Sequence, residues 1–146
     1  RALGRDLGSA GRAADAVEAQ RRSVALTDSL VATDPASGGH RADRVFALTL
    51  LGDAELAAGD ARAALASYRR AAPLGEAILR ADPDSGSPLD RLVLARAGLG
   101  NALAAAGDGD AGVEALRSAL ALVERGIARS PDDVGRRARM ARVLVD

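Results

Sequence analysis

The sequence predicts an all-α fold, an α–α superhelix in which antiparallel helical hairpins stack side by side. Three observations support this prediction. A unit of 48 residues recurs along the chain, the apolar residues inside each unit follow the period of an α-helix, and only 1% of the residues are aromatic although 48% are hydrophobic. The core must therefore consist of Ala, Leu and Val, whose small side chains suit closely packed helices.

Two markers define the repeat. The stretch LGDAELAAGD begins at Leu51, LGNALAAAGD begins 48 residues later at Leu99, and LGRDLGSAGR at Leu3 is a third copy. A proline recurs at the same spacing, at Pro35, Pro83 and Pro131. We expect one solenoid segment over 1–146, an excerpt of a larger bacterial protein. Its parts are a truncated first repeat (1–35), a second repeat (36–83), a third repeat (84–131) and the start of a fourth (132–146).

Each unit is predicted to hold two helices. In the second repeat, apolar and small residues follow Gly59 at alternating steps of three and four, which is one face of a helix about five turns long. Gly59 suits the left-handed position that ends a helix, and Asp60 suits the cap of the next one. We therefore expect helices near 40–58 and 60–81. We expect the same break at Gly11 and Gly107. This gives seven helices: two in each of the first three repeats, of which the very first is truncated, and one at the start of the fourth repeat.

Pro73 departs from the repeat, because the other copies have Ala25 and Ala121 at its position. A proline inside a helix removes a backbone hydrogen bond and clashes with the carbonyl of Arg69. A tolerated kink and a bend that sets the curvature of the array are both open interpretations.

The pattern resembles the tetratricopeptide repeat, whose signature is W-x2-L-G-x2-Y, then A-x3-F, then P. In the second repeat the signature falls on Leu48, Leu51, Gly52, Glu55, Ala64, Tyr68 and Pro83. The family unit has about 34 residues, so both helices here are about two turns longer. The resemblance implies a right-handed solenoid that binds proteins, of the long-helix variety attached to bacterial serine/threonine kinases, nucleotide-switch ATPases and caspase-like proteases.

No catalytic, cofactor-binding or metal site is predicted. His40, the single histidine, lies in the connector SGGHR without ligands at metal spacing, and the chain has no cysteine. Twenty basic residues balance twenty acidic ones, so no net charge attracts nucleic acid or a membrane. The cluster GRRARMAR is interpreted as the polar face of a helix. We expect a cytoplasmic protein that is not an enzyme and has no cofactor.

The predicted function is that of a protein–protein interaction scaffold, which holds a peptide or a neighbouring domain in its concave groove. The alternative is a spacer or oligomerisation arm of an attached enzyme, such as a kinase or ATPase. By the resemblance, Asn101 takes the place of an Asn that holds the ligand backbone, whereas the basic clamp for a free carboxylate is missing. Self-association through exposed repeat ends, including Val143, Leu144 and Val145, is a further expectation. The candidate groove residues are Arg5, Phe46, Thr49, Asp53, Leu56, Ala97, Asn101 and Ala104.

Overall fold

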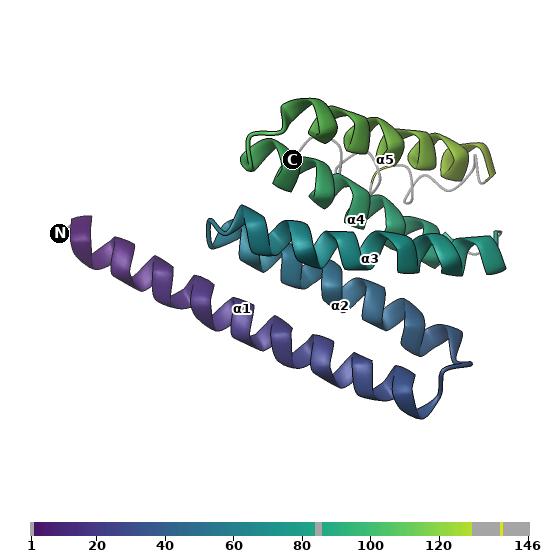
Figure 1. Ribbon diagram of the computed structural model, residues 1–146, viewed down its shortest axis with the longest axis horizontal. Coiled ribbons are helices and arrows are strands. Elements are labelled where there is room, and N and C mark those ends of the chain that lie inside the picture. Colours follow the sequence, from purple (N-terminus) through teal and green to yellow (C-terminus); the bar gives the residue numbers. More distant parts are fainter. Residues whose placement is uncertain (1, 84–85, 130–137, 139–146) are drawn as a thin grey trace.

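The chain folds into consecutive antiparallel helices (Figure 1). The computed structural model describes residues 2–83, 86–129 and 138, and their side chains from residue 11 on, except those of 86 and 87. Within these residues all regular structure is helical, which confirms the all-α prediction. The helices are α1 (Ala2–Thr33), α2 (Gly38–Ala57), α3 (Ala61–Ala81), α4 (Gly86–Ala105) and α5 (Gly109–Arg129). The helices expected at 40–58 and 60–81 correspond to α2 and α3.

The 48-residue period holds in the backbone, because α4 and α5 begin and end 48 residues after α2 and α3. Gly59 and Gly107 both have positive φ, 83° and 92°, a conformation that glycine adopts without steric cost. The aspartates that follow them, Asp60 and Asp108, form hydrogen bonds both with the helix that ends there and with the helix that begins there. The backbone N–H of Asp60 and of Asp108 bonds to the carbonyl five residues earlier. Their carboxylates accept the N–H three residues later, at 2.9 and 3.2 Å.

The break expected at Gly11 does not occur, and α1 runs through this residue as one helix. Arg12 follows Gly11, where aspartate follows the other two glycines, so no side chain caps a new helix there. The expected count of seven helices is therefore wrong, because the first repeat contributes one helix instead of two. The start of a fourth unit, with Val143, Leu144 and Val145, lies outside the described residues.

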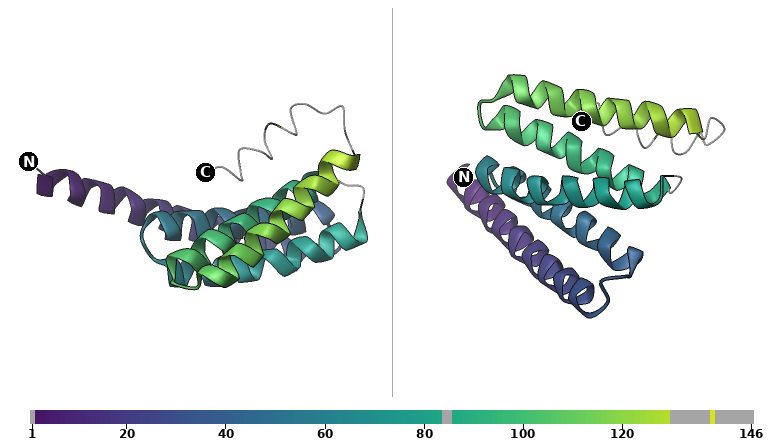
Figure 2. Two further views of the ribbon diagram at one scale, coloured as in Figure 1. Left: turned by 90° about the horizontal axis from the view of Figure 1, so that it is seen from above. Right: turned by 45° about the vertical axis from the view of Figure 1, so that its right-hand side comes forward.

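Two layers result from the packing of these helices. Each helix packs along the next one in the chain (Figure 2). Among the described residues α2 also packs against α4, whereas the backbones of α1 and α3, and of α3 and α5, stay apart. The first helices of the repeats, α2 and α4, thus pack directly against each other, whereas the backbones of the second helices α1, α3 and α5 do not. Leu26 and Leu30 on α1 and Val113 and Leu120 on α5 remain exposed.

The core lies between the two layers. Its largest fully buried side chains are Leu48 and Val45 of α2, Tyr68 of α3, and Leu92 and Val93 of α4. In the described part of the chain, no helix is both long enough and apolar enough to cross a membrane.

Candidate binding groove on the α2–α4 layer

An open depression of about 390 Å³ lies where α2 and α4 pack side by side. Four of the predicted groove residues line it: Asp53 and Leu56 on α2, and Ala97 and Asn101 on α4. The remaining lining residues are Ala57, Tyr68, Leu94 and Gly98. Half of the eight predicted groove residues therefore line one surface depression.

Tyr68 reaches this depression from α3, behind the layer. Its ring is fully buried between two glycines, because a Cβ atom built on Gly52 would lie 2.7 Å from the ring and one on Gly98 would lie 2.3 Å from it. In the third repeat, Leu116 stands at the equivalent position, 2.7 Å from the Cβ that Gly100 would carry. The glycine of the repeat signature thus makes room for a large side chain from the second helix, and only the middle repeat uses a tyrosine.

The tyrosine carries a polar group to the groove. Its hydroxyl donates a hydrogen bond to Oδ1 of Asp53, a residue that is itself exposed. Although Asp53 is exposed as a residue, the partial burial of its carboxyl raises the pKa of this group above its ordinary value, and the hydrogen bond from Tyr68 lowers it in part. The pKa of Tyr68 is raised far above its ordinary value by burial first, then by the hydrogen bond to Asp53, and then by the charges of Asp53 and Glu55.

This arrangement fixes a hydrogen-bond acceptor at the wall of the groove. An ionised carboxylate has two acceptor oxygens, and the tyrosine hydroxyl takes a single position on one of them. Asn101, exposed on α4, adds an amide that both donates and accepts. Leu56, Leu94 and Ala97 supply the apolar part of the lining. Such a surface suits a ligand with N–H donors beside a small apolar group.

Two predicted residues do not face a ligand in this groove. Thr49 is only 2% exposed, and its hydroxyl donates to the carbonyl of Val45 at 2.9 Å, so the layer itself covers it. Phe46 is 41% exposed but lies outside the depression. The guanidinium of Arg91 stands 5.4 Å from its ring centre, and the same arginine pairs with Asp43 at 3.2 Å.

Two further candidates remain, Ala104 and Arg5. Ala104 is exposed on α4 but does not line the depression. The side chain of Arg5 lies outside the described part of the chain. Tyr68 was predicted only as a position of the repeat signature, and neither Tyr68 nor Gly98 was among the predicted groove residues. The signal that could have found them is the single tyrosine of the sequence, together with Gly52 on α2 and Gly98 on α4, the two helices between which its ring packs.

His40 lies in the first turn of α2 and not in a connector, because that helix begins at Gly38. Ser37 caps the helix by accepting the backbone N–H of His40 at 3.2 Å. In the described residues, no three His, Asp or Glu side chains gather where they could hold a metal ion.

No family model matches this chain, and neither a curated protein nor a solved structure is detectably similar to it. The resemblance to the tetratricopeptide repeat therefore stays a prediction from the sequence.

Proposed function

We propose that this chain is a tetratricopeptide-like interaction module that holds a peptide segment of another protein, or of a neighbouring domain, in the α2–α4 groove. One observation carries the proposal. A carboxylate held by a buried tyrosine and an exposed amide stand in one open depression with apolar lining, on the layer where first helices of successive repeats meet. Stacked repeats use such continuous surfaces for recognition, without the converging groups that catalysis requires.

The chemistry of the lining limits the ligand. Asp53 is the single charged residue among the eight that line the depression. A free C-terminal carboxylate would meet this negative charge without a basic partner. A peptide backbone or a basic side chain would instead donate N–H groups to Asp53 and to the amide oxygen of Asn101. We therefore propose an internal peptide segment as the ligand.

The paired substitution Asp53→Ala with Asn101→Ala tests this proposal. The partner is first identified by pull-down with the chain, and its affinity is then measured by calorimetry. Asn101 is exposed and contributes little to stability, whereas Asp53→Ala removes the acceptor of the Tyr68 hydroxyl and should lower the free energy of unfolding by about 1 kcal/mol. We expect the variant to stay folded and to lose about 1 kcal/mol or more of binding, roughly fivefold in Kd.

A matched control removes two exposed polar residues elsewhere. Glu114 and Arg117 form an ion pair on the surface of α5, with side chains 71% and 70% exposed. The variant Glu114→Ala with Arg117→Ala should bind the partner like the wild type. If the groove variant also binds like the wild type, the chain acts as a spacer or oligomerisation arm and the proposal is wrong.

We also propose the kind of protein that contains this module. A module of this kind would serve a larger bacterial regulatory protein in the cytoplasm, where an attached kinase or nucleotide-switch ATPase would use the groove to recruit its partner. The sequence of the complete protein tests this directly, because an adjoining catalytic domain of either class would support it.

A further inference from the structure

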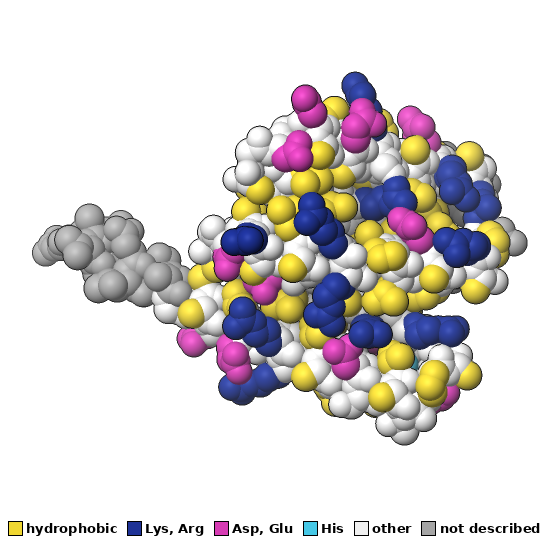
Figure 3. Space-filling view, in the orientation of Figure 1, with side chains coloured by type: hydrophobic (Ala, Val, Ile, Leu, Met, Phe, Trp, Pro, Cys, Tyr) yellow, Lys and Arg dark blue, Asp and Glu magenta, His cyan; other side chains and the backbone are white. Residues whose placement is uncertain are grey.

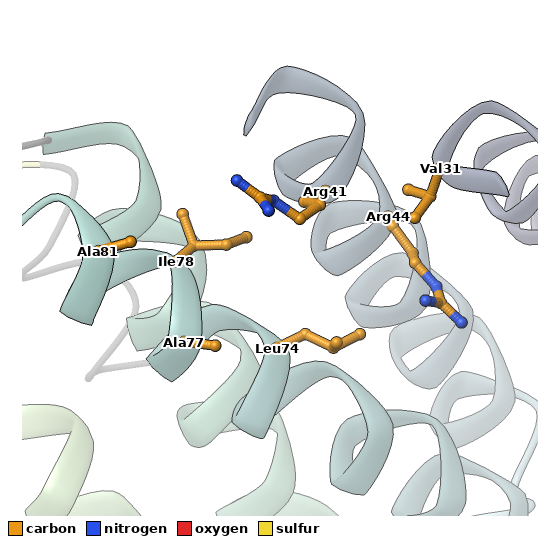
Figure 4. A pocket seen from close by; sticks show the side chains of 7 residues that line it. All are labelled: Val31, Arg41, Arg44, Leu74, Ala77, Ile78 and Ala81. Atoms are coloured by element: carbon orange, nitrogen blue, oxygen red, sulfur yellow. The ribbon is translucent and has the colours of Figure 1, made fainter. Parts of the chain in front are cut away.

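A second groove runs along the opposite side of the molecule, between α1 and α3. It exists because these two helices leave a gap whose floor is α2. Two depressions mark it. One depression, of about 160 Å³, lies at one end of the groove. Its lining includes Val31, Leu74 and Ile78 together with Arg41 and Arg44 (Figure 4). The other, of about 330 Å³, is lined by Arg21, Val24, Leu51, Glu55, Ala63, Ala66, Ser67 and Arg70.

The smaller depression departs from the repeat. Arg41 and Arg44 are equivalent to Leu89 and Leu92, which lie 48 residues later. Those leucines are only 3% and 2% exposed and belong to the core cluster that joins α3, α4 and α5. At the equivalent place between α1 and α3, arginines replace the leucines. The apolar walls made by Val31, Leu74 and Ile78 consequently border an open space instead of a filled core.

The arginines give this groove a positive character. Asp28 pairs with Arg44 at 2.6 Å and with Arg70 at 3.8 Å, and these contacts cross the groove between its two depressions. Arg41 donates to the carbonyl of Pro35 at 3.3 Å. Figure 3 shows arginine side chains along the strip between α1 and α3.

The second depression adds one more ion pair to the groove. Glu55 lies 3.7 Å from Arg21 and accepts a hydrogen bond from Ser67 at 2.7 Å. Four arginines therefore face two carboxylates along the groove, although the chain as a whole has a net charge of zero.

We propose that the α1–α3 groove binds an acidic peptide segment of a partner protein, with an apolar side chain in the depression between Leu74 and Ile78 and carboxylates on Arg41 and Arg44. The occupant is deduced from charge complementarity and from the apolar space that leucines fill in the next repeat. Bidentate arginine–carboxylate pairs supply orientation, and the apolar contact supplies discrimination against other polyanions. This surface is separate from the α2–α4 groove, so the chain would hold two different segments at once.

Random peptide display tests the proposal. The bait is the variant Asp53→Ala with Asn101→Ala, which leaves only the second groove intact. We expect selected peptides to be enriched in Asp or Glu beside Leu, Ile or Val. A parallel selection on the same variant with Arg41→Leu and Arg44→Leu should lose this enrichment, because the substitutions restore the leucine pair of the third repeat. Equal enrichment on both baits, or none on the first, would overturn the proposal.

The enriched peptide then locates its own site. The chain has two isoleucines, Ile78 in the depression and Ile127 on α5. In a methyl-labelled sample the signal of Ile78 should shift on binding while that of Ile127 stays. Arg41→Gln, a single change at an exposed residue, should lower the affinity about tenfold while the fold is retained. A single-stranded DNA oligonucleotide that displaces the peptide and shifts Ile78 equally would show unspecific attraction of anions and contradict the assignment. A shift of neither signal would contradict it as well.

Discussion

Raising the pH above the ionisation range of tyrosine should destabilise this protein through one side chain. Tyr68 is its only tyrosine, and the sequence contains neither cysteine nor lysine. Arginine stays protonated in proteins, so Tyr68 is the one side chain that loses a proton near pH 10 in the unfolded chain. In the folded chain, burial and the neighbouring Asp53 raise the pKa of Tyr68 far above that value.

The sign of the effect follows from proton linkage. Below about pH 10 both states keep the tyrosine proton, and the free energy of unfolding does not depend on it. Above that pH the unfolded state binds fewer protons than the folded state, so stability falls as the pH rises. The slope approaches about 1.4 kcal/mol per pH unit, which gives a loss of about 1.4 kcal/mol at one unit above the unfolded pKa.

The assay is urea unfolding followed by circular dichroism, from about pH 8 to about pH 11. Tyr68→Phe is the control, since it keeps the ring between Gly52 and Gly98 but has nothing to ionise. Its cost at neutral pH is the lost hydrogen bond to Asp53, about 1 kcal/mol, and its stability should not fall over this range. A flat profile for the wild type, or the same decline in Tyr68→Phe, would refute the burial of this hydroxyl.

Two further predictions concern helix positions that the repeat makes comparable. Gly98→Ala should destabilise the chain by about 1–3 kcal/mol in urea unfolding, because the new Cβ would meet the ring of Tyr68. Gly11→Ala, within α1 and with no other atom near its Cβ, should instead stabilise it by about 0.5–1 kcal/mol, and a loss there would mean that the helix breaks at this point. Pro73→Ala should raise the melting temperature, since Pro73 is exposed inside the continuous helix α3 and alanine restores the missing backbone donor. A lower melting temperature would show that the packing of α3 requires the proline.

The helices were predictable from the sequence because their signals are local. The apolar period identified α2 to α5, and a glycine followed by aspartate marked the junctions at Gly59 and Gly107. The error at Gly11 has the same local origin, since a glycine ends a helix here only when the next residue can cap another one. Arg12 cannot do so. The prediction followed the 48-residue spacing and disregarded that Arg12 stands where Asp60 and Asp108 stand in the other repeats.

The candidate site was predictable only in part, because its contacts depend on how helices pack. The helical spacing on α2 and α4, combined with the 48-residue repeat, placed Asp53 level with Asn101, and both do border the depression. The same spacing included Thr49, which the α2–α4 packing buries. The bond from Tyr68 to Asp53 joins two helices across a hairpin, and no pattern within either helix reveals which side chain fills the space beside Gly98.

Site-specific photocrosslinking tests the central claim, that a partner segment occupies the α2–α4 groove. A benzophenone amino acid replaces Leu56 in the groove or, as the control, Arg117 on α5, and each protein is irradiated in an extract of its own cells. We predict a partner adduct from position 56 that disappears when Asp53→Ala and Asn101→Ala are added, and none from position 117. Equal adducts from both positions, or an adduct at 56 that survives the double substitution, would contradict the claim.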